Sequence, residues 1–206
     1  MEKMIAAVQN NAEKANTYRE LKGRFSKAVK EGFYFEAMLI EYAMIEDRAL
    51  SFLYHCGIQN TRDDLKISKI SRNRLLLTIL PPKEGKDRRY SLNSLGGKIE
   101  IITAALEWAS TIEHTPEDKY LKALKSQIES LDVYEFQETL QGIENWKNYR
   151  NEVIHGLLNK KVDALWTDLS SKVEEGMHYA NILDKQVRII KKNNKIRHAA
   201  NLPVRG

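Results

Sequence analysis

A long stretch in the first third of this sequence contains no residue that would interrupt a helix. Residues 33–56, FYFEAMLIEYAMIEDRALSFLYHC, include neither glycine nor proline, and the first helix breaker after them is Gly57. Apolar residues fall on most faces of this segment, as is typical of a helix that is surrounded by others. The whole chain holds only 10 Gly and 4 Pro in 206 residues, which favours long helices. The segment is therefore expected to be the central helix of an all-α protein.

Further helices are predicted on both sides of this segment. Residues 2–30 are rich in Ala, Lys, Glu and Arg, and Gly32 is a suitable stop. Another helix is expected to begin at Thr115, which can cap it, with Pro116 at its first position, and to run to about Leu131. The other predicted helices span residues 94–108, a segment from Val133 or Tyr134 to His155, and residues 162–192. Together they predict an up-and-down helical bundle of five or six helices.

Positive charge is concentrated in two segments. Residues 61–90 hold nine Lys/Arg against four Asp/Glu, and residues 185–206 hold seven against none, in a chain whose net charge is +5. Two basic segments on an acidic body suit a polyanionic partner such as RNA, although solvated loop and tail charges would give the same pattern. The length fits one well-packed domain. We therefore expect a single domain over residues 1–206, with a basic excursion at 58–92 and a basic C-terminal tail at 193–206.

Several classes of protein are disfavoured by what the sequence lacks. It shows neither the start of a secretory signal nor an uncharged apolar run long enough to span a membrane, so a cytoplasmic protein without membrane contact is expected. The one cysteine, Cys56, is expected to be a small core residue. No cofactor or metal is expected, because the chain shows neither a phosphate-binding loop nor metal-ligand spacing. Surface or packing roles are expected for His55, His114, His178 and His198, and core positions for Trp108, Trp146 and Trp166.

The segment before Gly156 carries an anomaly. Apolar side chains recur there at helical steps of three and four residues and so form one buried stripe: Ile143, Trp146, Val153 and Leu157. Arg150 lies on the same stripe. A guanidinium in an apolar seam is costly unless an anion, a carboxylate or a subunit interface offers it hydrogen-bond partners.

A second, polar stripe lies beside the first. Asn148, Asn151 and His155 follow one another at three and then four residues, so they share a helix face. The Asn151 amide is expected to reach the imidazole of His155 or a shared substrate. Arg150 and His155 are separated by about 140° around an ideal helix and do not stack.

The run Arg150-Asn151-Glu152-Val153-Ile154-His155 resembles the motif of the HEPN superfamily, which is an Arg, a polar residue, three variable residues and a His. The resemblance implies a helical bundle over roughly residues 33–190 that forms a homodimer in which two motifs face one cleft. It also implies a metal-independent endoribonuclease, found in toxin–antitoxin pairs, abortive-infection defence and RNA-targeting CRISPR effectors. Arg150, Asn151 and His155 would then be the catalytic residues, and an antitoxin or other protein would be a possible partner.

The residue types suit this chemistry. RNA supplies its own nucleophile, the 2′-hydroxyl, so a cleaving site needs a base, an acid and positive charge at the phosphate. His155 can transfer protons, and Arg150 can donate two hydrogen bonds to phosphate oxygens. In a two-fold dimer, the two His155 side chains could serve as base and acid.

Other interpretations of the same residues remain open. Arg150 could pair with a buried acid such as Glu46 or Asp47 while His155 only caps a helix end, or one of Glu41, Glu46 and Asp47 could orient Arg150 for catalysis. The runner-up function is a non-catalytic helical module that binds RNA or a protein partner. A third function, nucleotide binding, would use the same Arg and His on a phosphate.

Overall fold

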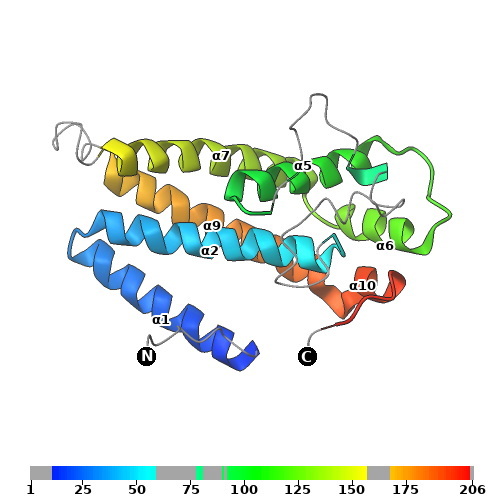
Figure 1. Ribbon diagram of the computed structural model, residues 1–206, viewed down its shortest axis with the longest axis horizontal. Coiled ribbons are helices and arrows are strands. Elements are labelled where there is room, and N and C mark those ends of the chain that lie inside the picture. The colour runs from blue at the N-terminus through cyan, green and yellow to red at the C-terminus, as the bar shows by residue number, and fades with distance from the viewer. Residues whose placement is uncertain (1–10, 59–77, 81–89, 91, 157–167, 205–206) are drawn as a thin grey trace, which may run out of the picture.

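The computed structural model describes residues 11–58, 78–80, 90, 92–156 and 168–204. All the regular secondary structure in these ranges is helical (Figure 1). The elements are α1 (Asn11–Lys30), α2 (Tyr34–His55), α5 (Leu95–Thr111), α6 (Lys119–Ile128), α7 (Val133–Gly156), α9 (Leu169–Lys191), the 3-10 helix η1 (Lys192–Asn194) and α10 (Lys195–Ala199). The predicted fold class, an all-α helical bundle, is confirmed.

The helix α2 lies at the centre of the bundle. It packs against α1, α5 and α9, and its Met38, Ile45 and Phe52 side chains have no exposed surface. It ends before Gly57, which has φ 73°, and α1 ends before Gly32, which has φ 76°. Glycine enters this left-handed region without strain, so both glycines stop a helix as predicted.

The neighbours of α2 run in both directions. In Figure 1, α1 and α7 run opposite to α2, whereas α5 and α9 run the same way as α2. The contacts agree for α9, because Glu41 lies against Gly176 and Arg48, further along α2, bonds Asp184 at 3.0 Å. The pairs α1–α2, α5–α7 and α7–α9 are therefore antiparallel, whereas α2 and α5 are parallel.

The start of α6 differs from the prediction. The helix begins at Lys119 and not at Pro116, and the capping side chain is Asp118 and not Thr115. One Asp118 carboxylate oxygen accepts hydrogen bonds from the backbone N–H groups of Tyr120 at 2.9 Å and Leu121 at 3.0 Å. The first N–H groups of a helix have no partner inside it, so a side chain that accepts from two of them fixes the start.

The basic C-terminal segment folds back onto the bundle. Its helix α10 packs against α6, and Ile196 and Arg197 are fully buried. The Arg197 guanidinium donates to the backbone oxygens of Tyr54 at 2.6 Å and Pro203 at 2.9 Å. Arg197 is therefore a packing residue, whereas the nearby Lys192 and Lys195 are exposed.

The expected core residues are in place where the structure describes them. Cys56 and Trp146 are fully buried and Trp108 is 7% exposed, while Trp166 and Leu157 lie outside the described residues. Burial raises the pKa of the Cys56 thiol, which makes it a poor nucleophile. Most of the basic excursion also lies outside the described residues; within it, Ile79 and Leu80 are buried.

Candidate functional site

The helix α7 carries the two stripes that its sequence predicts. Ile143, Trp146 and Val153 are buried against the bundle, and the indole N–H of Trp146 donates to the backbone oxygen of Lys172 at 2.8 Å. Arg150 continues this stripe toward the end of the helix and is half-buried. The structure therefore places a guanidinium at the edge of the apolar seam.

Arg150 is held by an amide and an aromatic ring. Its Nη1 donates to the Asn151 side-chain oxygen at 3.1 Å, and its Cζ lies 4.5 Å from the centroid of the Tyr42 ring. The Nε atom is buried and has no hydrogen-bond partner among the described residues. No carboxylate in the described part of the chain forms an ion pair with Arg150. The guanidinium keeps its full charge and retains unused donors.

None of the three acids considered as partners of Arg150 forms an ion pair with it. Glu46 accepts from Lys98 at 2.7 Å, and Asp47 accepts from Lys14 and Arg48, each at 2.8 Å. The carboxyl group of Glu41 is fully buried beside Trp146 and Gly176. Within the described residues, the alternative in which Glu46 or Asp47 neutralises Arg150 therefore has no contact to support it.

The third motif residue forms no hydrogen bond with the first two. His155 is exposed, one residue before α7 ends at Gly156, and it makes no hydrogen bond or ion pair with a described residue. The Asn151 side-chain oxygen bonds Arg150 and not the imidazole. One chain thus joins Arg150 to Asn151 by a hydrogen bond, while His155, on the same helix face as Asn151, bonds neither of them.

The sequence interpretation missed Tyr42 and the surface around it. Phe35, Leu39, Tyr42 and Ala43 follow one another at helical spacing and form what we call the outer stripe of α2. Leu39 is 48% exposed, Ala43 is also exposed, and Phe35 and Tyr42 are half-buried. The sequence does indicate this stripe. Apolar residues occupy most faces of α2, so some of them also lie on the face that is directed away from the bundle.

A backbone group of α5 also lies near the Tyr42 phenol. Burial and the nearby Glu46 carboxylate raise the pKa of the Tyr42 phenol, while Arg150 and the backbone N–H of Leu95 act in the opposite direction. Leu95 is the first residue of α5. Groups from α2, α5 and α7 therefore meet around the Tyr42 side chain.

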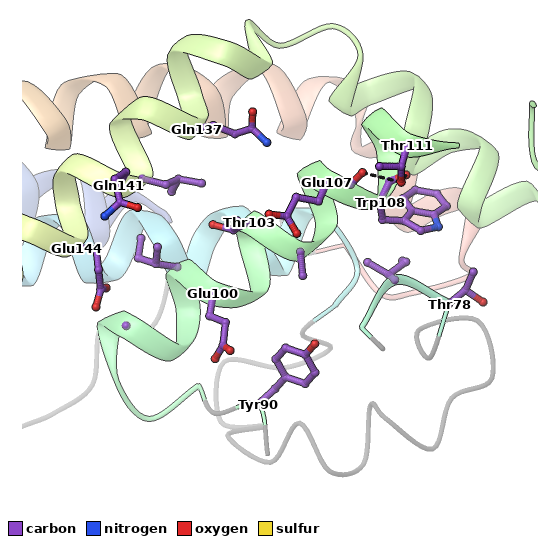
Figure 2. Close-up of a pocket in the computed structure, with 15 residues that line it drawn as sticks. Thr78, Tyr90, Glu100, Thr103, Glu107, Trp108, Thr111, Gln137, Gln141 and Glu144 are labelled. Atoms are coloured by element: carbon purple, nitrogen blue, oxygen red, sulfur yellow. Dashed lines mark hydrogen bonds between the residues drawn. The ribbon is translucent and has the colours of Figure 1, made fainter. Parts of the chain in front are cut away.

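A separate cavity of about 1020 Å³ lies between α5 and α7, as Figure 2 shows. Its lining includes the acids Glu100, Glu107 and Glu144 and, among the described residues, neither Lys nor Arg. Arg150 and His155 do not line it. Although Glu144 is paired with Lys147, the lining offers a phosphate no described cation, so the Arg150 surface suits a nucleic-acid backbone better than this cavity does.

No group of three or more His, Cys, Asp or Glu among the described residues lies close enough together to hold a metal ion. Among the described helices, none combines the length and the apolar character that a membrane span requires.

Comparison of the chain with protein-family models, with curated proteins and with solved structures found no match.

Proposed function

We propose that this chain is a metal-independent endoribonuclease of the HEPN type that cleaves single-stranded RNA in the cytoplasm, in a toxin or defence system. The observation that carries the proposal is Arg150. It is a half-buried guanidinium, held by Asn151 and Tyr42, that no described carboxylate neutralises. A charge kept in an apolar seam needs an anion, and an RNA phosphate fits its paired donors.

The motif residues divide the reaction between them. The 2′-oxygen attacks phosphorus and forms the new P–O2′ bond while the P–O5′ bond breaks. One His155 accepts the 2′-hydroxyl proton, and a second His155 donates a proton to the leaving 5′-oxygen. Arg150 stabilises the charge on the phosphorane oxygens, and Asn151 orients Arg150. The products are a 2′,3′-cyclic phosphate and a 5′-hydroxyl.

A second copy of the chain completes this site. One chain supplies one His155, and that side chain lies away from its own Arg150, so a two-fold dimer is needed to place two imidazoles at one phosphate. The outer stripe of α2 supports such an interface, since it exposes Leu39 and Ala43 beside the Tyr42 ring that holds Arg150. Exposed apolar side chains that adjoin a functional group are typical of interaction surfaces.

The direct test is cleavage of a short single-stranded RNA in EDTA, followed by analysis of the product ends. We expect cleavage without metal, cyclic phosphate ends, and no reaction with a substrate carrying 2′-O-methyl at the cleaved position or with DNA of the same sequence. A requirement for magnesium, or products with 5′-phosphate ends, would contradict the proposed chemistry.

A second function is favoured by the position of His155. Because this imidazole contacts neither Arg150 nor Asn151 within one chain, the same surface would also serve a non-catalytic module that binds RNA, a nucleotide or a protein partner through Arg150 and the outer stripe. Such a module would bind the 2′-O-methyl RNA and leave unmodified RNA intact, with or without His155.

A further inference from the structure

The Arg150 guanidinium rests on an aromatic face that comes from a different helix. Tyr42 belongs to α2 and Arg150 to α7, and the Arg150 Cζ lies 4.5 Å from the ring centroid. A cation over a tyrosine face is attracted by the electron density of the ring. The contact fixes where the guanidinium can lie without using its hydrogen-bond donors.

The Asn151 contact leaves donors on the two Nη atoms available, while the Nε–H is buried. A guanidinium has five N–H groups, and one nitrogen, Nη1, donates to Asn151. A carboxylate partner would orient Arg150 too, but it would cancel the charge and occupy the donor pair. An aromatic ring orients the guanidinium and leaves both its charge and its donor pair for a phosphate.

Tyr42 is itself held in place. Its ring is half-buried on the outer stripe of α2, and the backbone N–H of Leu95, at the start of α5, lies near its phenol. A ring that is partly buried against its neighbours is a firmer support than a fully exposed side chain.

We propose that Tyr42 is a positioning residue that holds the Arg150 guanidinium ready for a phosphate. This inference rests on the proposed function for the identity of the anion, RNA, although not for the contact itself. Tyr42 acts through Arg150 and takes no part in bond making or proton transfer.

The contact has a spectroscopic signature that does not depend on catalysis. The buried Nε–H of Arg150 is protected from solvent, so its NMR resonance is observable, and its position near the ring face shifts the proton upfield. Tyr42→Phe keeps the ring and should retain the shift, whereas Tyr42→Leu should lose it. A resonance that stays unchanged in Tyr42→Leu would show that the ring does not hold Arg150.

The functional arm uses a fully 2′-O-methylated RNA as an uncleavable probe. We expect Tyr42→Leu to weaken its binding roughly three- to tenfold, the range of a cation–aromatic contact, and Tyr42→Phe to weaken it less than about twofold. Tyr134→Leu is the control, since Tyr134 is 71% exposed near the start of α7 and should bind the probe like the unaltered chain.

A double variant separates positioning from a general structural role. If Tyr42 acts through Arg150, then Tyr42→Leu in an Arg150→Ala background should cause no further loss of probe affinity. An equal loss in both backgrounds would overturn the proposal. If the unaltered chain binds the probe in this pattern but does not cleave RNA, the nuclease is excluded and the role of Tyr42 stands. Absence of any binding would overturn phosphate positioning by Tyr42.

Discussion

Among single residues, Glu41 combines complete burial with carboxyl oxygens that have no hydrogen-bond partner in the described structure. Burial raises the pKa of its carboxyl group from 4.5 to about 9, and the nearby backbone N–H of Met177 offsets only part of this effect. The acid is therefore neutral in the folded chain at pH 7 and ionised in the unfolded chain. Its neutral form fits between Trp146 and Gly176, where a charge would not.

This shift predicts the direction of a pH effect on folding. The pKa of Glu41 is higher in the folded chain than in the unfolded chain. Its contribution to stability is therefore fully present below pH 4.5 and is lost as pH rises toward about 9. The unaltered chain should lose roughly 2 to 3 kcal/mol of unfolding free energy between about pH 5 and pH 7 because of Glu41. Glu41→Gln should not show this loss. The measurement is denaturant unfolding of both proteins across this range.

The matched control is Glu129→Gln, at the exposed glutamate that follows the last residue of α6. If the difference in unfolding free energy between the unaltered chain and Glu41→Gln stayed constant with pH, the carboxyl group would not be neutral in the folded state.

The sequence identified Arg150 but not its support, for a physical reason. A cation on an apolar stripe is visible from spacing within one helix. Its contact with Tyr42 joins two helices that are far apart in the chain, and such packing is not encoded in local spacing. The Asn151 amide was expected to reach His155 or a shared substrate, whereas in the structure its oxygen accepts a hydrogen bond from Arg150.

At the scale of elements, helix existence was predicted better than helix ends. The predicted helix from Val133 or Tyr134 to His155 matches α7, Val133–Gly156, and residues 33–56 match α2, Tyr34–His55. The predicted start of α6 was wrong because two side chains that can cap a helix, Thr115 and Asp118, lie three residues apart. The sequence alone does not show which of them caps the helix. The spacing of apolar residues predicts where helices lie but not their relative directions, which depend on the segments that connect them.

The cap of α6 can be tested by a matched pair of variants. Asp118→Ala removes the acceptor for two backbone N–H groups and should cost about 1 kcal/mol of stability. Thr115→Ala should change stability by less than about 0.5 kcal/mol, since Thr115 is exposed and outside the helix. Thermal or denaturant unfolding compares them, and a larger destabilisation by Thr115→Ala would reinstate Thr115 as the cap.

The end of α9 and the segment after it present exposed lysines. If Lys191, Lys192 and Lys195 bind RNA phosphates, replacing all three by Gln should reduce the slope of log affinity against log salt by roughly 0.7 for each phosphate that is no longer neutralised. The control replaces the exposed Lys22, Lys27 and Lys30 of α1 by Gln. Binding of the uncleavable RNA is titrated at several salt concentrations, and equal slopes for the two triple variants would remove this segment from the interface.

At the scale of the whole molecule, the proposal requires two copies. Leu39→Glu places a charge on the exposed outer stripe of α2 and should convert the dimer to a monomer at micromolar concentration without unfolding the chain, because Leu39 is 48% exposed. Tyr134→Glu, at a side chain 71% exposed near the other end of α7, should leave the dimer intact. Light scattering gives the mass, and a dimer that survives Leu39→Glu would place the interface elsewhere.

The central claim is that His155 carries proton transfer at an RNA phosphate held by Arg150. The most direct measurement is the single-turnover cleavage rate in EDTA, taken together with RNA affinity, for His155→Ala. Arg150→Ala should slow cleavage comparably by removing the positive charge at the phosphate, and Asn151→Ala should slow it less. We expect His155→Ala to reduce the rate by roughly two to four powers of ten while RNA affinity and helix content stay unchanged. An unchanged cleavage rate in His155→Ala would contradict the central claim.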